Sequence, residues 1–326
     1  MKHNNKSKDI FTWAKGLDLA VEANSFLRGD GNREIAGVAE KVLHRRGIVI
    51  HRITVLNTKG AERIGRPPGR YITLDIPAYG NDTDPADIAQ TVAEELADLL
   101  PLPIREAPLL VLGLGNCNAT PDALGPKVAE LTCATRHLFA HRRNIRDIAP
   151  VCTIAPGVLG NSGIETAEII RGVCHHISPA AVIAVDSLAA ASVTRVGTTI
   201  QIAETGIRPG SGIDDRRCPI NSDLTGCPVI AIGVPTMVDS AAIITETANA
   251  LEAYRLRHQP QRQVYPDIAA CRFAEEQLLN RFRGRLMVTP KDIDELIEKD
   301  AEIIAAAIAI AVHPAATKDN YLNFLC

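Results

Sequence analysis

The feature that most constrains this fold is an alternation of short, wholly apolar runs with longer stretches of helical periodicity. Residues 108–114 contain the run LLVLGL, and residues 180–186 read AAVIAVD. A run that is apolar at every position suits a strand buried on both faces. Apolar residues at helical spacing lie between the two runs, over residues 122–139 and 163–177. This order predicts a three-layer α/β fold, with a mostly parallel sheet and helices on both faces.

The flanking sequence adds strands before this core and helices after it. Further strands are expected at residues 48–56, 70–76, 198–202 and 228–234, and further helices at 82–100, at 240–254 and after Pro290. The last helix is apolar nearly all round, which predicts that it packs against the sheet. Residues 255–266 are rich in Arg and Gln and predict a loop. A chain of 326 residues could hold one domain or two. The alternation favours a single α/β domain over residues 16–326, preceded by a polar arm over residues 1–15.

Charge and cysteine usage narrow the functional classes. The 35 basic and 38 acidic residues give a net charge of −3, so there is no overall basic field for nucleic acid. The eight cysteines form no Cys-x-x-Cys pair of the kind that structural zinc sites use. Residues 1–9 are polar with no secretory apolar run behind them, and the apolar run at 303–312 is half the roughly 20 residues of a membrane span. We therefore expect a cytoplasmic protein that binds neither nucleic acid nor membrane.

Two acidic residues stand where ligands bind in α/β proteins, at the carboxyl ends of buried strands. Asp122 lies in a glycine-containing stretch after the first run, at a helix start, and Asp186 directly follows the second run. Two carboxylates held close together cannot both ionise at low cost, so one keeps its proton while the other activates water. Such a pair suits amide hydrolysis. Each acid alone is also explained as a cap, at a helix N-terminus or at a strand end.

Other motifs give weaker indications. The pair Gly113 and Gly115 lacks the third glycine of a dinucleotide fingerprint, and neither a Walker loop nor His-Glu-x-x-His is present, so no cofactor or metal is expected. Cys117 is a conceivable nucleophile, but no base lies near it in the sequence. His137 and His141 are four residues apart and could bind a metal, yet no acid is placed to complete the set.

Glycine-rich loops supply candidate substrate contacts. Residues 204–212 follow a predicted strand, residues 156–163 precede a predicted helix, and both stretches contain several glycines. Backbone N–H groups in such loops can hold a carbonyl or a carboxylate. The expected substrate-binding positions are Gly115, Asn116, Gly157 and Gly206.

Long ordered segments resemble the germination protease family of spore-forming Firmicutes. They include LLVLGLGNCNATPDALGPKV, IAPGVLGNSGIETAEII, VIAVDSLAAASVTRVGTTIQIAETGIRPGSG and PVIAIGVPTMVD, and shorter matches extend over nearly the whole chain. The resemblance implies a cytoplasmic endopeptidase of the spore core that degrades small acid-soluble spore proteins. It further implies an inactive homotetrameric zymogen that removes a short N-terminal propeptide by self-cleavage. The implied fold is similar to that of hydrogenase-maturation endopeptidases, and the implied catalytic acids are Asp122 and Asp186.

The sequence departs from the family pattern at three places. Cys117 stands where the family usually has Trp, and Ser187 stands where Ala is usual. Gly16 and Leu17 precede Asp18 where the family has an Arg-Thr pair, so we expect cleavage near Lys15, Gly16 and Leu17, with residues 1–15 as the propeptide. The alternative is a catalytically silent homologue, or a nickel-binding protein that uses the same two acids as ligands.

Overall fold

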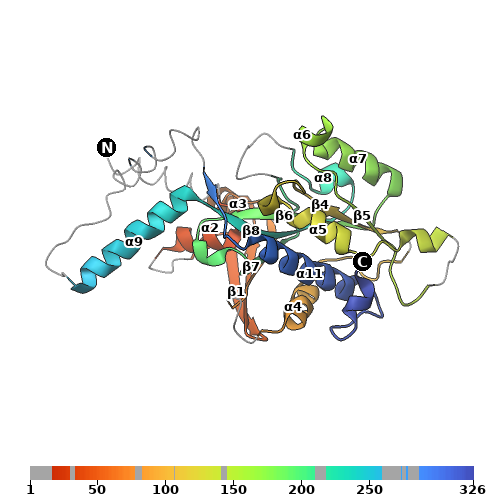
Figure 1. Cartoon of the computed structure of the whole chain (residues 1–326), viewed down its shortest axis with the longest axis horizontal. Helices are drawn as coiled ribbons and strands as arrows, with labels where there is room; N and C mark the ends of the chain where they lie inside the picture. The colour runs from red at the N-terminus through yellow and green to blue at the C-terminus, as the bar shows by residue number, and fades with distance from the viewer. Residues whose placement is uncertain are drawn as a thin grey trace.

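The computed structural model describes residues 17–29, 34–77, 83–105, 107–140, 145–209, 218–258, 273, 277 and 286–326. In this part of the chain, nine strands form one sheet in the order β1-β2-β3-β7-β8-β6-β4-β5, and β9 pairs with β8 (Figure 1). The strands are β1 (Val38–Arg45), β2 (Ile48–Val55), β3 (Gly69–Asp75), β4 (Leu109–Gly113), β5 (Val151–Ile154), β6 (Ala181–Ala190), β7 (Thr199–Ala203), β8 (Val229–Asp239) and β9 (Met287–Val288).

The α/β fold class is confirmed, but the sheet is mixed. Strands β5, β4, β6 and β8 pair in parallel, whereas β1, β2, β3 and β7 add to β8 by antiparallel pairing. The sequence did not reveal β1, because it is an edge strand without a buried residue. A two-residue turn joins β1 to β2, with positive φ at Arg46 and Gly47, as a tight hairpin requires. The parallel pairing expected for most of the sheet therefore holds only for the half made of β5, β4, β6 and β8.

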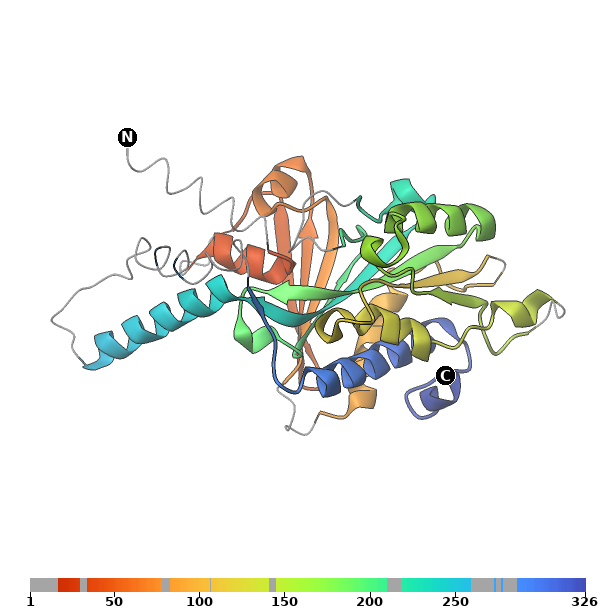
Figure 2. The ribbon, with the colours of Figure 1, turned by 45° about the horizontal axis from the view of Figure 1, so that its top comes forward.

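Helices cover both faces, so the three expected layers are present (Figure 2). One face carries α4 (Pro85–Ala97), α5 (Leu124–Leu131) and α11 (Ile293–Val312), and the other carries α2 (Ala20–Arg28), α3 (Thr58–Ile64), α7 (Thr166–Ile177) and α8 (Ser222–Thr225). The short α6 (Leu159–Ser162) precedes α7, and α9 (Ser240–His258) extends away from the sheet (Figure 1). Among the described residues, no helix has the length and apolar character that crossing a membrane requires.

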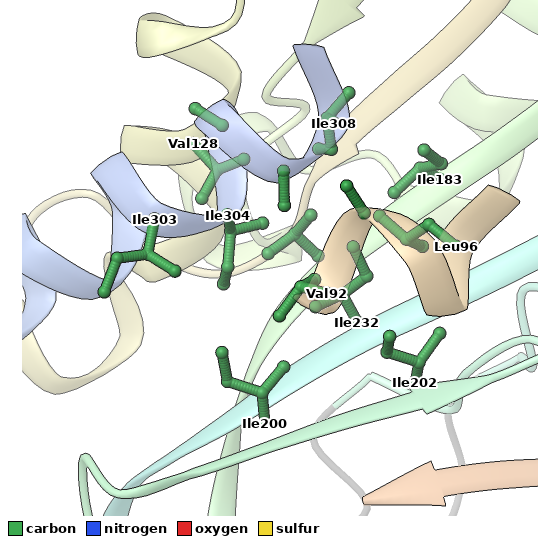
Figure 3. Close-up of a cluster of buried hydrophobic side chains, with 14 of the residues drawn as sticks. Val92, Leu96, Val128, Ile183, Ile200, Ile202, Ile232, Ile303, Ile304 and Ile308 are labelled. Atoms are coloured by element: carbon green, nitrogen blue, oxygen red, sulfur yellow. The ribbon is translucent and has the colours of Figure 1, made fainter. Parts of the chain in front are cut away.

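The largest core lies between the sheet and α11, whose Ala- and Ile-rich second half is buried nearly all round, as its sequence predicts. Figure 3 shows Ile304 and Ile308 of α11 close to Val128 of α5 and to side chains of α4. Isoleucines of three adjacent strands, Ile183, Ile202 and Ile232, complete this cluster beneath α4. Branched aliphatic side chains thus fill most of this core, in a chain with only 4% aromatic residues.

Two predicted elements end elsewhere than expected. The helix predicted over residues 122–139 stops at Leu131, because Thr132 forms a β-bridge with Leu325 and a separate 3-10 helix follows at Arg136–Ala140. Strand β6 continues beyond Asp186 to Ala190, because β8 is long enough to pair with it there. Residues 255–258 belong to α9, and the rest of the predicted loop at 255–266 lies outside the described residues.

Two glycines let α5 pack directly on the parallel strands. A Cβ at Gly113 of β4 would lie 2.2 Å from the carbonyl oxygen of Gly125 in α5. A Cβ at Gly125 would lie 2.4 Å from the nitrogen of Leu114 and 2.5 Å from the carbonyl oxygen of Val185. These neighbours are backbone atoms that cannot rotate away. Glycine at both positions is therefore required for the observed distance between helix and sheet.

This packing predicts opposite effects for two Gly-to-Ala substitutions in helices. Gly125→Ala forces α5 away from β4 and β6 and should lower the free energy of unfolding by about 3 kcal/mol. Gly172→Ala lies on the exposed side of α7 with no atom near its Cβ, and should raise that free energy by about 0.5–1 kcal/mol. Urea denaturation followed by circular dichroism measures both. Equal effects at the two positions would contradict the packing argument.

Candidate active site

Asp122 sits in a 3-10 turn, Thr120–Asp122, that folds back on the loop after β4. The backbone N–H of Asn116 donates to Asp122 Oδ2 at 2.9 Å and to the Asp122 carbonyl at 3.0 Å. Gly115 has a φ of 113°, and a Cβ there would lie 2.1 Å from the Asp122 carbonyl oxygen. Gly115 and Asn116 thus fix the half-buried Asp122 at the end of β4.

Asp186 lies at the same end of the parallel strands. The last register pair between β4 and β6 is Gly113 with Val185, and the N–H of Leu114 donates to the Val185 carbonyl at 2.8 Å. Asp186 is the next residue, is 4% exposed, and accepts a hydrogen bond from the N–H of Ser187 at 3.0 Å. Since α5 packs on Val185, the turn carrying Asp122 and the strand carrying Asp186 meet at one corner of the sheet.

Thr236 holds this corner together, although no sequence motif pointed to it. The pairing of β6 with β8 shifts between Leu188 and Ala189, which leaves Thr236 as an extra residue on β8. Its hydroxyl donates to the Pro121 carbonyl at 2.6 Å, next to Asp122, and its own carbonyl accepts from Thr289 at 2.9 Å. A threonine inside an apolar strand is unremarkable in a single sequence, so only the bulge reveals its role.

A cavity of about 340 Å³ opens beside Asp186 on the same face of the sheet. Gly233 of β8 pairs with Asp186 on one side and with Gln201 of β7 on the other. Paired residues point to the same face, so the acid and the cavity lie along one row. Gly206, a predicted contact residue, also lines the cavity. The lining residues include Leu17, Asp18, Arg66, Tyr71, Gln201 and Gly233.

Residues 17–20, which follow the predicted arm, close one side of this cavity. The side-chain amide of Gln201 accepts from the N–H of Ala20 at 2.6 Å and donates to the carbonyl of Asp18 at 3.1 Å. The Asp18 carboxylate accepts from the N–H of Ala189 at 2.9 Å, at the point in β6 where the register with β8 shifts. The guanidinium of the buried Arg66 donates to the carbonyl of Leu17. These contacts join residues 17–20 to the strands that carry the site.

The remaining predicted positions either do not line this cavity or lie outside the described residues. Gly157 has a φ of 73° in the loop after β5, where its carbonyl accepts from Thr166. Cys117 is exposed in the loop after β4, and His137 lies in the 3-10 helix after α5. His141, Lys15 and Gly16 lie outside the described residues. Within the described ranges, no group of three or more His, Cys, Asp or Glu side chains is arranged to hold a metal ion.

Glu22 of α2 is an acid in an unfavourable environment near this site. Burial raises its pKa to about 7 from an ordinary value of 4.5, although the N–H of Ala191 donates to both carboxylate oxygens at 3.1 Å. Arg195 lies 3.6 Å away and favours the ionised form without overcoming the burial. The folded protein therefore holds a proton on Glu22 at pH values where the unfolded chain has lost it.

The fold and this corner define an α/β protein whose ligand site lies at the carboxyl ends of parallel strands. The model of one protein family, described as germination protease, matches residues 15–264. The chain is 41% identical to a germination protease of Clostridium perfringens over 321 residues, covering 94% of this chain and 98% of the relative. It is 35% identical to one of Bacillus thuringiensis over 359 residues, covering 96% and 97%.

The chain therefore belongs to the germination protease family and is a peptidase, as its sequence motifs predict. Among solved structures, it is similar to a NiFe hydrogenase maturation protease from Thermococcus kodakarensis, with a TM-score of 0.32 and 16% identity over 66% of this chain and 98% of that chain.

The raised pKa of Glu22 predicts that stability falls as pH rises from 4.5 to about 7. Over that range the unfolded state releases the proton more readily, so ionising Glu22 costs the folded state on the order of 3 kcal/mol by pH 8. Glu22→Gln keeps an acceptor for Ala191 and cannot ionise. Its Tm relative to the parent chain should increase steadily between pH 5 and pH 8.

The exposed Glu62 of α3 provides the matched control. Glu62→Gln should leave the Tm difference from the parent chain constant over the same pH range. A Glu22→Gln curve parallel to that of the parent chain would show that Glu22 titrates normally in the folded protein.

Proposed function

We propose that this peptidase is an endopeptidase that begins the degradation of small acid-soluble spore proteins during germination, with Asp122 and Asp186 as its catalytic acids. The observation that carries the proposal is the packing of α5 on Val185. That contact brings the Asp122 turn against the residue that precedes Asp186. The family relationship supports the class of reaction, and the cavity beside Asp186 supports a peptide substrate.

Two neighbouring carboxyl groups can hydrolyse an amide bond with water alone. One carboxylate takes a proton from water, which attacks the peptide carbonyl, and the other carboxyl group protonates the departing nitrogen. Backbone N–H groups of Asn116 and Ser187 orient the two acids and need no substrate to do so. Asp186 is buried, so its surroundings are shielded from bulk water, which strengthens its interaction with charge that develops nearby. The atypical aspartic mechanism follows from this pair.

Replacing either acid should abolish cleavage without unfolding the protein. Asp122→Asn and Asp186→Asn keep the shape of the side chain, but an amide can neither accept the proton of water nor donate one to a leaving nitrogen. We expect at least about a 1,000-fold loss of kcat for each, within the range that general acid-base groups contribute. The measurement is the cleavage of a purified small acid-soluble spore protein, followed by mass spectrometry.

The exposed Asp223 of α8 gives a matched control, since Asp223→Asn should retain full activity. Circular dichroism must show that all three variants are folded. Full activity of either the Asp122 or the Asp186 variant would rule out the acid pair. Loss of stoichiometric bound metal with the Asp122 change, in a chain that cleaves nothing, would instead favour the metal-binding alternative.

We further propose that the chain is made as a zymogen, with residues 1–15 as the propeptide and residues 16–326 as one α/β peptidase domain. The support is the position of Leu17, which lines the cavity and whose carbonyl is held by Arg66. Leu17, two residues after the proposed propeptide, therefore lies at the proposed substrate cavity. The mature enzyme is proposed to be a homotetramer in the spore core, with spore proteins as its substrate and no nucleic acid or membrane partner.

Self-processing is testable on the purified chain. Incubation should shorten the N-terminus at a bond near Lys15 to Leu17, whereas Asp186→Asn should stay full length under the same conditions. N-terminal sequencing and intact mass identify the bond. Processing of the Asp186 variant at the same rate would show that another enzyme or another residue makes the cut.

A further inference from the structure

The segment after α11 folds back onto the end of α5. Thr132 and Leu325 form an isolated antiparallel bridge, and the N–H of Cys326 donates to the Leu131 carbonyl at 2.9 Å. His313, which caps α11, stacks on Phe324 with 5.3 Å between ring centroids. The backbone position of Cys326 is therefore fixed relative to residues 131–133.

This pairing places two thiols side by side. In the antiparallel bridge, Cys326 lies opposite Leu131, and Cys133 is two residues further along the same chain. Cys133 and Cys326 each directly follow a residue of this bridge, so they lie diagonally across it on one face. Burial raises the pKa of the Cys133 thiol, and the neighbouring Cys326 thiol raises it further. Cys326 is exposed and Cys133 is half-buried.

The other described cysteines lie in different surroundings. Cys174 of α7 packs with Cys152 and Cys227 in the core beneath this helix, and burial raises the pKa of each thiol, to about 11 for Cys174. Because the thiolate is the reactive form, these three are poor nucleophiles toward an external disulfide. Burial also raises the pKa of Cys133, but that thiol has only to attack a mixed disulfide formed on its neighbour. Cys117 and Cys218 are exposed, and the Cys218 thiol donates to the Pro219 carbonyl. Cys133 and Cys326 thus combine a thiol neighbour with access to solvent.

We propose that Cys133 and Cys326 are a redox modification site, which a low-molecular-weight disulfide oxidises to an intramolecular disulfide bond. The exposed Cys326 thiolate attacks one sulfur of the oxidant, forms a mixed disulfide and releases the first small thiol. The Cys133 thiolate then attacks Cys326 Sγ and releases the second. The two protein thiols lose two electrons and two protons, and the oxidant becomes two small thiols that carry those protons.

The bond ties the segment at 313–326 to the end of α5. It closes a loop from residue 133 to residue 326, which contains β6, β8 and α11. Cross-linking over so long a loop restricts the unfolded chain more than the folded one. The site thereby makes the stability of the half of the sheet that carries Asp186 depend on the redox state of its surroundings. This inference does not rest on the proposed peptidase mechanism.

The test compares the purified full-length chain in oxidised glutathione and in dithiothreitol, with free thiols then blocked by iodoacetamide and the protein digested with trypsin. The oxidised sample should contain residues 128–136 linked to the peptide with Cys326, lighter by two hydrogens than the separate reduced peptides. Its Tm should exceed that of the reduced sample by about 5 °C. Dithiothreitol should reverse both changes.

Variants make the assignment specific. Cys326→Ser and Cys133→Ser should each lose the linked peptide and the Tm shift, while Cys117→Ser, a change at an exposed cysteine in another loop, should keep both. The proposal is overturned if Cys133 and Cys326 carry only glutathione, if either is linked to another cysteine, or if Cys326→Ser shows the same Tm shift on oxidation.

Discussion

The direct contact between α5 and the backbone of β4 and β6 is the constraint on which the site depends. Side chains normally hold a helix about 10 Å from a sheet, but Gly113 and Gly125 remove them at the point of contact. The start of α5, with the turn that contains Asp122, is thereby pressed against Val185. No flexible linker separates the turn from the strand, so the position of one acid relative to the other follows from the packing of rigid elements.

A second constraint comes from the neighbouring strand β8. The bulge at Thr236 lengthens β8 by one residue relative to β6, and this single irregularity provides two anchors. Thr236 holds the Asp122 turn through Pro121, and the N–H of Ala189 is bound by Asp18. The segment that begins at Leu17 is therefore fastened to the strand that carries Asp186. Any change at residues 17–20 acts on the site through Ala189 and Gln201.

What the sequence predicts well is what local burial determines. Strand β4 and the first half of β6, residues 181–185, are apolar at every position because helices cover both faces, and that pattern is visible in one sequence. Strand β1 has no buried residue and left no such pattern. The end of α5 depends on residue 325, and the cavity depends on Leu17, Arg66 and Gln201, which are far apart in the chain. Asp122 and Asp186 can be proposed from the sequence because Asp122 stands at a predicted helix start and Asp186 directly follows a predicted strand.

One glycine shapes the sheet between the acid and the cavity. Asp186, Gly233 and Gln201 are direct neighbours across three strands, and Gly233 and Gln201 line the cavity. A Cβ at position 233 would lie 2.4 Å from Leu188 Cδ1, so Leu188, which also lines the cavity, would have to move. Glycine at this one position therefore sets the place of Leu188 and, with it, the shape of the cavity next to Asp186. That shape is thus a property of the sheet itself, not of the loops around it.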